Sequence, residues 1–332
     1  MINQKKKMKP DAISLLDEFV DLEPEIENFQ DALLRGLSAE QKYLPCKFFY
    51  DETGSELFNQ ICELDEYYVT RTENQILEEN AQEISRIIGS RCNLFELGSG
   101  SSRKVKILLD VLEKPVGYTA LDISKEHLIK SCAELSPIYP GIPIRAICTD
   151  YSKSLALPFK SSESNNIVVF FPGSSLSNFD SKNAIKFLER VANLLKDSEG
   201  GFLIGIDLKK DQEVLEAAYD DSDRVTAKFN LNLLIRANRE LNANFDVSKF
   251  SHRAIYNHEK GRIEMHLVSR INQIVSIGSH LFKFFENEYI HTENSYKYSL
   301  SQFEKMWREA GFNSSRHWCD IKEYFSVHYL KL

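Results

Sequence analysis

The feature that most constrains the fold is a regular alternation of apolar runs and amphipathic stretches between residues 93 and 208. The apolar runs have the length and composition of buried strands; they are residues 93–97, 118–123, 144–149, 167–171 and 201–208. Apolar residues at helical spacing separate them, in residues 103–112, 124–135 and 180–195. Because strands joined through helices pair in parallel, this pattern predicts an α/β fold with a doubly wound sheet.

The chain on either side of this stretch has a different pattern. About the first 90 residues are mostly helical by spacing, and a basic run at residues 5–9 is expected to be a solvated tail. Residues 222–241 predict one long helix, and residues 249–277 predict an antiparallel hairpin that turns at residues 259–261. In its second strand, the apolar residues two positions apart share one face; they are Ile263, Met265 and Leu267. An insertion of this kind predicts a lid or a substrate domain. A helix at residues 299–310 and a strand at residues 325–329 are expected to return to the sheet.

The first strand of the alternation runs directly into a glycine turn, "NLFELGSGSSRK" (residues 93–104). In open α/β sheets a ligand lies beyond the carboxyl ends of the strands, where glycine lets the backbone approach it closely. Asp122 and Asp150 stand at the ends of the next two strands. A carboxylate at the end of the second strand accepts hydrogen bonds from ribose hydroxyls in NAD enzymes and in S-adenosylmethionine (SAM) enzymes alike. The turn therefore predicts a nucleotide site without naming the nucleotide.

Two residues separate these possibilities. Arg103 stands where the G-x-G-x-x-G dinucleotide motif requires its third small residue. Glu96, just before the glycines, would repel a pyrophosphate and would suit a ligand that carries an ammonium group. These residues favour SAM over NAD, but a dehydrogenase and a purely structural turn stay open. The G-x-S-x-G hydrolase elbow is disfavoured, because Ser177 replaces its last glycine.

Composition excludes several other classes of protein. The formal net charge of −8 argues against a nucleic-acid partner, and no apolar run approaches the ~20 residues that span a bilayer. The cysteines are scattered without a C-x-x-C pair, which predicts reduced thiols and a cytoplasmic location; they are Cys46, Cys62, Cys92, Cys132, Cys148 and Cys319. No histidine pair has a familiar metal spacing, so no metal is expected; the pairs considered are His258 with His266, and His317 with Cys319. No obligate protein partner is evident.

Eight short stretches, in order from about residue 28 to the C-terminus, show a resemblance to one family. They are "LPCKFFYDETGSELFNQI" (residues 44–61), "EYYVTRTE" (66–73), "ELGSGSSRK" (96–104), "GSSLSNF" (173–179), "DLKKD" (207–211), "AYDD" (218–221), "RIEMHL" (262–267) and "TENSYKY" (292–298). The chain resembles the SAM-dependent histidine Nα-methyltransferases of ergothioneine biosynthesis. This resemblance implies a class I methyltransferase domain at residues 72–205 and 298–332. It also implies an α+β substrate-binding domain assembled from residues 1–71 and 206–297.

The resemblance also implies roles for individual residues. For SAM it implies Tyr50, Gly98, Lys104, Asp122, Asp150 and Tyr151, with Asp122 on the ribose and Asp150 on the adenine amino group. For the amino acid it implies Phe58, Tyr67, Asn178, Tyr219, Met265, Glu293 and Ser295. In that scheme Asn178 and Tyr219 hold the α-carboxylate, and Glu293 and Ser295 hold the two imidazole nitrogens. A carboxylate and a hydroxyl two residues apart in extended chain do point the same way, so both can reach one ring.

The sequence departs from the family pattern at a few positions: Cys46 and Val69 replace prolines, Ser101 replaces a threonine, and Ser177 replaces a glycine. The last change matters most, because an added side chain there is expected to shift Asn178 and to weaken the grip on the carboxylate. The residues implied to select histidine are all present.

The leading hypothesis is therefore transfer of methyl groups from SAM to the α-nitrogen of L-histidine, three times, which gives Nα-trimethylhistidine (hercynine). The alternatives are the same chemistry on another amino acid or amine, such as tryptophan or tyrosine, or a catalytically silent SAM-binding protein. Tyr50 is the candidate general base by analogy, and water is an equal alternative.

Overall fold

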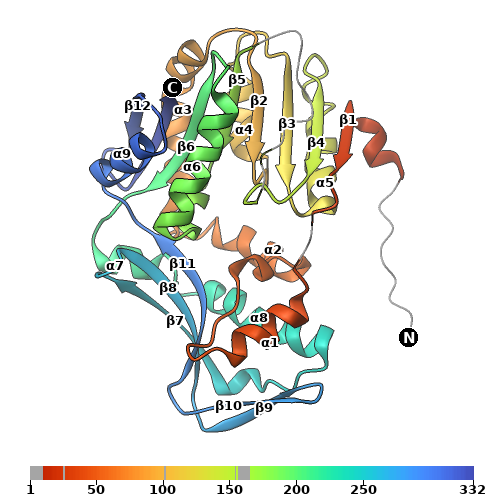
Figure 1. Ribbon diagram of the computed structural model, residues 1–332, viewed down its shortest axis with the longest axis vertical. Helices are drawn as coiled ribbons and strands as arrows, with labels where there is room; N and C mark the ends of the chain where they lie inside the picture. Colours follow the sequence, from red (N-terminus) through yellow and green to blue (C-terminus); the bar gives the residue numbers. More distant parts are fainter. Residues whose placement is uncertain (1–9, 25–26, 101, 154, 156–164) are drawn as a thin grey trace.

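The computed structural model describes residues 10–24, 27–100, 102–153, 155 and 165–332. The basic run at residues 5–9 and the departure at Ser101 lie outside this part of the chain. The described chain forms two regions, a large sheet with its helices and a smaller region built around an antiparallel sheet (Figure 1).

The large sheet contains every strand predicted from the alternation, together with three more. Its strands, in spatial order, are β1 (Glu18–Asp21), β4 (Ile144–Cys148), β3 (Gly117–Asp122), β2 (Asn93–Leu97), β5 (Ile167–Phe171), β6 (Gly201–Asp207), β13 (Phe325–Lys331) and β12 (Ser314–Cys319). The strands from β1 to β6 run parallel, whereas β13 and β12 are antiparallel to their neighbours. The strand order reverses between β2 and β5, because the sheet is extended in one direction from β2 and in the other from β5. The glycine turn after β2 lies at this reversal, where open sheets bind ligands.

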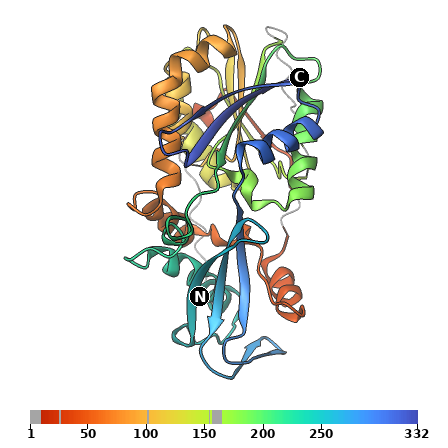
Figure 2. The same ribbon diagram turned by 90° about the vertical axis from the view of Figure 1, so that its left-hand side faces the viewer.

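Helices cover both faces of this sheet, as the alternation predicts. They are α3 (Tyr68–Ile88), α4 (Arg103–Leu109) and α5 (Lys125–Leu135) on one face, and α6 (Ser181–Leu195) and α9 (Leu300–Glu309) on the other (Figure 2). Successive strand residues therefore join different cores: Leu94 packs with the first group of helices and Phe95 with the second. Burial on both faces explains why the strands read as continuous apolar runs. The α/β doubly wound fold is confirmed.

The smaller region contains the predicted hairpin and two further strand pairs. Its three-stranded sheet has the order β11 (Tyr289–Tyr296), β8 (Arg262–Ser269) and β7 (Phe250–Asn257), and β9 (Gln273–Ile277) pairs with β10 (His280–Phe284). Around them lie α1 (Phe29–Ser38), α2 (Glu52–Ile61), α7 (Gln212–Ala217), α8 (Val225–Leu241), and the short turns η2 (Cys46–Phe49) and η4 (Val247–Lys249). The hairpin turns at Gly261, which has a positive φ of 64°. The predicted face of β8 is buried as expected; it comprises Ile263, Met265 and Leu267.

Some boundaries differ from the sequence prediction for local reasons. The long helix α8 begins at Val225 rather than at residue 222, because the carboxylate of Asp221 accepts hydrogen bonds of 2.7 Å from the amides of Val225 and Thr226. The turn η1 (Pro10–Leu15) and strand β1 precede α1, and β1 pairs with β4 in the large sheet. This part of the N-terminal segment, which the sequence analysis assigned to the smaller domain, therefore lies with the large sheet.

The smaller region leaves and re-enters the large sheet at one point. Leu208, just after β6, forms a bridge with Tyr298, just after β11. The Tyr298 amide donates to the Asp207 carbonyl at 3.2 Å, and the Lys209 amide donates to the Tyr298 carbonyl at 2.9 Å. The carboxyl end of β6 is thus shared by both regions.

Candidate active site

The predicted cofactor residues lie at the carboxyl ends of three neighbouring strands. Gly98 follows β2 with a positive φ of 72°, and its amide donates to the Leu121 carbonyl at 2.8 Å. A side-chain carbon at Gly98 would lie 3.0 Å from the Tyr151 hydroxyl oxygen. Both the backbone conformation and this close approach therefore require glycine at the turn.

The two predicted carboxylates beyond β3 and β4 are each held by a local turn. The Asp122 side chain accepts from the Ser124 amide at 2.8 Å, and burial raises the pKa of Asp122. The Asp150 side chain accepts from the Ser152 amide at 3.1 Å. Hydrogen bonds of this kind fix the direction of a carboxylate at a strand end, so both groups are oriented before any ligand arrives.

The glycine turn also carries polar atoms that suit a polar ligand. Ser99 and Ser102 are buried, and their hydroxyl oxygens have no hydrogen-bond partner among the described residues. A buried hydroxyl without a partner is costly. A nucleoside-containing ligand at this turn would offer partners to both groups.

Lys104, expected to face SAM, pairs with Glu73 of α3. Glu73 is fully buried, and its carboxylate also accepts from the amide of Gly173, at 3.0 and 2.8 Å to its two oxygens. Lys104 therefore lies between the glycine turn and the loop after β5. Through these contacts, Glu73 links the glycine turn and the loop after β5 to α3.

The structure weakens one argument made from the sequence. Glu96 is buried and accepts a hydrogen bond from the Tyr118 hydroxyl, and burial raises the pKa of Glu96 to about 8. This side chain is therefore mostly protonated at neutral pH in the free protein. Its expected attraction to an ammonium group is smaller than that of an ionised carboxylate.

On the other side of the junction, the predicted cofactor residue Tyr50 and predicted substrate residues from distant segments form a row of aromatic rings. The ring centroids of Tyr50 and Phe58 are 5.5 Å apart, those of Phe58 and Tyr67 are 6.3 Å apart, and those of Tyr67 and Tyr219 are 6.1 Å apart. Each pair has edge-to-face geometry, which is favourable for aromatic rings. The electron-rich faces of these rings can contact a cation.

Tyr219 connects the aromatic row to strand β11. Its hydroxyl lies 2.8 Å from the Ser295 hydroxyl, and the ammonium group of Lys297 donates to both, at 3.0 Å and 2.8 Å. Lys297 also donates to the carboxylate of Asp207 at 2.6 Å. The side chains of Tyr219 and Ser295 are therefore held in place by a buried charge.

Glu293 lies two residues before Ser295 on the same strand. A register shift between His291 and Glu293 in the pairing of β11 with β8 places Glu293 opposite Met265. Burial raises the pKa of Glu293 to about 7, although the charge of Lys297 acts to lower it. This carboxylate is therefore poised between its charged and neutral forms near physiological pH.

Three further predicted residues differ in exposure. Met265 is buried in the core beneath β8, whereas Asn178 is exposed at the end of η3 (Ser175–Asn178), a turn that contacts β11. Tyr50 keeps 43% of its surface exposed. Desolvation, together with the carboxylate of Glu293, still raises the pKa of Tyr50 well above its ordinary value. The role of Tyr50 as general base stays a prediction.

Comparison with known proteins decides the family. A family model described as "Histidine-specific methyltransferase, SAM-dependent" matches residues 29–332. The chain belongs to this family. It is similar to histidine N-alpha-methyltransferase of Mycolicibacterium smegmatis, with 39% identity over 290 residues that cover 86% of this chain and 89% of that protein. It is also similar to ergothioneine biosynthesis protein 1 of Schizosaccharomyces pombe, with 31% identity over 280 residues, 81% of this chain and 36% of that protein.

A more distant relative carries another substrate in its name. The 4-dimethylallyltryptophan N-methyltransferase of Claviceps purpurea is 26% identical over 327 residues, 90% of this chain and 94% of that protein. Family membership makes the chain a SAM-dependent methyltransferase, so the dehydrogenase alternative left open at the glycine turn is wrong.

In this member of the family, charged residues to which the sequence did not point lie behind the site. Lys297, Asp207 and Glu73 are all buried, and they link predicted ligand residues to the large sheet. A signal for Lys297 was present, because it stands two residues after Ser295 in extended chain and so shares its face. Asp207 stands in the matching stretch "DLKKD" (residues 207–211), three residues before its partner Lys210, but its partners Tyr68 and Lys297 come from segments far apart in sequence.

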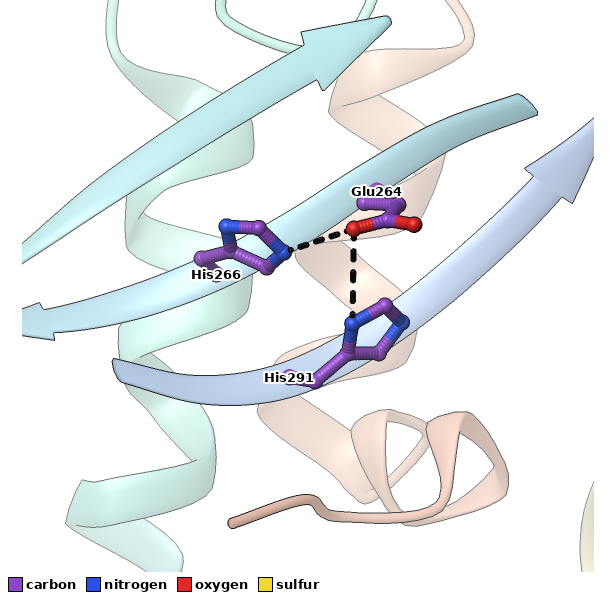
Figure 3. Close-up of side chains that lie close together, drawn as sticks. All are labelled: Glu264, His266 and His291. Carbon is purple, nitrogen blue, oxygen red and sulfur yellow. Dashed lines mark hydrogen bonds and ion pairs between the residues drawn. The ribbon is translucent and has the colours of Figure 1, made fainter. Parts of the chain in front are cut away.

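A group of possible metal ligands, which sequence spacing did not suggest, lies on the three-stranded sheet of the methyltransferase. Glu264 and His266 of β8 and His291 of β11 point toward one another (Figure 3). Nε2 of His266 lies 3.2 Å from the Glu264 carboxylate, and Nδ1 of His291 lies 3.7 Å from it.

Neighbouring arginines oppose a metal there. Arg262 binds Glu264 at 2.6 Å. Arg253 donates to Nδ1 of His266 at 3.3 Å, which leaves the proton of a neutral ring on Nε2, the atom that faces Glu264. A metal at Nε2 would have to displace this proton, and the two guanidinium groups beside the single carboxylate disfavour a cation. The cluster is better described as a hydrogen-bonded network.

Among the described helices, none is long and apolar enough to cross a bilayer.

Proposed function

We propose that this enzyme transfers methyl groups from SAM to the α-amino nitrogen of L-histidine, three times, to give Nα-trimethylhistidine. The observation that carries the proposal is the approach of Glu293, Ser295 and Tyr219 to a row of aromatic rings at the junction of the two regions. A carboxylate and a hydroxyl two residues apart suit the two nitrogens of an imidazole. The aromatic row suits the ammonium group that gains methyl groups.

In this proposal the smaller region, with the N-terminal segment from α1 onward, binds the amino acid, and the large sheet binds SAM. Gly98, Asp122 and Asp150 would hold the nucleoside, assisted by Tyr151. Lys104 and Tyr50 would lie toward the methionine part. SAM supplies an electrophilic methyl group on a sulfonium. The chain's own part is to orient the nitrogen in line with that methyl group, which is a large share of the rate in such transfers.

Recognition of the ring would come from opposite hydrogen-bonding roles. An ionised Glu293 accepts the ring N–H, and Ser295 bonds the other nitrogen. A charge-assisted hydrogen bond is worth about 1.5–3 kcal/mol. Phenylalanine would leave Glu293 desolvated and without a partner, so we expect the site to reject it strongly.

The α-carboxylate would lie between Asn178 and Tyr219. The amine would face Phe58 and Tyr67, where cation–π contact contributes about 0.5–2 kcal/mol to the charged product. An α-amine is largely protonated at neutral pH, so a proton must leave before each transfer. The raised pKa of Tyr50 disfavours its phenolate form, and we therefore propose that the proton leaves to water, with Tyr50 as the alternative base.

The test is to incubate the purified protein with SAM and all twenty amino acids and to read methylated products by mass spectrometry. We expect mono-, di- and trimethylated histidine alone. Methylated tryptophan or tyrosine would instead support the alternative that the enzyme methylates another amino acid. SAM binding without any product would instead indicate a catalytically silent protein.

The place of the reaction in metabolism is also part of the proposal. Trimethylated histidine is the precursor implied for ergothioneine by the resemblance, so this enzyme would act early in such a pathway. We also propose a cytoplasmic location. This rests on the scattered cysteines alone, which are free thiols in the described chain.

A further inference from the structure

The ammonium group of Lys297 has all three of its hydrogens engaged. Lys297 is 2% exposed, and its partners are Asp207 at 2.6 Å, Ser295 at 2.8 Å and Tyr219 at 3.0 Å. Although burial acts to lower it, the pKa of Lys297 is raised by the carboxylate of Asp207, so the group stays charged. Because an ammonium can only donate, the hydroxyl oxygens of Ser295 and Tyr219 must both accept from it.

A count of protons then fixes what the hydroxyl pair can offer to a ligand. Tyr219 and Ser295 together have two O–H groups, and one of these forms the 2.8 Å bond between them. The other O–H has no partner among the described residues. A phenol is more acidic than an alcohol, so Tyr219 is the better donor within the pair. Ser295 then accepts from both Lys297 and Tyr219, which fills its two lone pairs, and its own O–H points outward. The single O–H of Tyr219 is used within this pair, so in this scheme Asn178, and not the Tyr219 hydroxyl, holds the α-carboxylate.

We propose that Lys297 is a positioning residue that makes Ser295 a hydrogen-bond donor toward the substrate. The inference rests on the proposed function and sharpens it. Glu293 lies on the same face of β11 and offers an acceptor, so the strand presents one acceptor and one donor. This pair matches a neutral imidazole, which has one N–H and one nitrogen with a free lone pair.

The surroundings of Asp207 indicate that Lys297 does more than neutralise a buried carboxylate. Lys210 already binds Asp207 at 2.6 Å, and the Tyr68 hydroxyl donates to it at 2.8 Å. The cluster therefore contains two lysines for one carboxylate. A second buried ammonium is costly unless its hydrogen bonds are used. Those of Lys297 reach the substrate residues, whereas those of Lys210 do not.

This difference supplies a matched pair of variants. Lys297→Met and Lys210→Met each remove one buried charge from Asp207, but only the first frees the lone pairs of Ser295. We expect Lys297→Met to raise the KM for histidine at least about tenfold, because a ring nitrogen then loses a fixed donor in a desolvated site. We expect Lys210→Met to change this KM by less than about twofold, and SAM affinity to hold in both. Equal effects of the two variants on KM would overturn the proposal.

A double-mutant cycle tests whether Lys297 acts through Ser295. If it does, Lys297→Met adds little to the KM of Ser295→Ala, because the hydroxyl it positions is already gone. Multiplication of the two single effects would contradict the proposal. Should Lys297→Met not fold, as judged by SAM binding and thermal melting, Lys297→Gln takes its place in the cycle, because it removes the charge while its amide can still donate to Asp207.

Failure of this inference is distinguishable from failure of the proposed function. If the unmodified enzyme does not methylate histidine, the proposed function is wrong and the inference falls with it. If histidine is methylated but Lys297→Met keeps the KM of the unmodified enzyme, only the positioning role is wrong.

Discussion

On the proposed cofactor side, the predicted contacts come mainly from the ends of β2, β3 and β4, between residues 98 and 151; on the substrate side, they come from segments between residues 50 and 297. The cofactor side depends on backbone geometry, a left-handed glycine and carboxylates held by local turns. The substrate side depends on side chains held by buried charges, with Asp207 and Lys297 at their centre. A site built from backbone geometry can be predicted from a short sequence motif. A site built from side chains that buried charges orient can be predicted only once the fold is known.

The largest effect expected from this comparison is on the shared charge at the junction. Asp207→Asn leaves two buried lysines without a counter-charge, and removal of one partner from a buried pair costs about 3–5 kcal/mol in the free energy of unfolding. Urea unfolding measures this loss. The control is Glu63→Gln, since the exposed pair of Glu63 with Arg103 is worth at most about 1 kcal/mol. If the free energy of unfolding falls no further in Asp207→Asn than in Glu63→Gln, the buried charge is not central to the substrate side and the contrast with the cofactor side fails.

Glu293→Gln should separate function from stability on the substrate side. The amide cannot match a charged acceptor, so we expect the KM for histidine to rise roughly tenfold to a hundredfold at pH 8. In the unmodified enzyme this KM should also rise as the pH falls through about 7, because the carboxylate is then protonated. The glutamine variant should lack this component of the pH profile. An unchanged KM in the variant would mean that Glu293 does not contact the ring.

The same variant should be more stable than the unmodified protein when no ligand is bound. The pKa of Glu293 is about 7 in the folded protein against an ordinary value of 4.5, so burial favours its protonated form. Its contribution to stability is complete below pH 4.5 and is lost as the pH rises through 7. Glu293→Gln should therefore raise the free energy of unfolding by up to about 3 kcal/mol at pH 8.5 and by almost nothing at pH 4. Equal stability at the two pH values would contradict the raised pKa.

On the cofactor side, Gly98→Ala should weaken SAM binding with little effect on histidine. A residue with a β-carbon at φ 72° costs about 1–2 kcal/mol, and that carbon would press on the Tyr151 hydroxyl. We expect about a tenfold loss of SAM affinity by calorimetry. Gly141→Ala is the control, because a β-carbon at that position has open space around it. A comparable loss in the control would show that the turn has no special role.

The smallest effect concerns Ser177, which stands where the family resemblance implies glycine. Its buried hydroxyl lies 2.6 Å from the Ser174 hydroxyl, which accepts from the Asp207 amide at 2.8 Å. Ser177 therefore ties the loop before Asn178 to β6. Ser177→Gly should lower stability by about 1 kcal/mol through the lost hydrogen bond and should change the KM for histidine by less than about twofold. A clear fall in KM would instead support the expectation that Ser177 shifts Asn178.

Within the large sheet, the strands that the sequence predicted are those buried on both faces, since they read as continuous apolar runs. β1 was missed because it has four residues, two of them acidic, and β12 because it is a polar strand at the edge of the sheet. The residues of the aromatic row were identified only through resemblance to a family. The roles of Glu73 and Asp207 were not predicted, because Lys104 and Lys297 meet them through the fold, at separations that no local pattern records.

The bridge between Leu208 and Tyr298 has a consequence for how such enzymes diversify. The two ends of the insertion are hydrogen-bonded neighbours at the edge of β6, so the large sheet closes whether the chain between them is long or short. Under the proposed function, a different insertion spliced between the same two points would replace Tyr219, Met265, Glu293 and Ser295 and leave Gly98, Asp122 and Asp150 unaltered. Exchange of the insertion at this junction between relatives with different substrates is therefore a direct route to enzymes with new specificity.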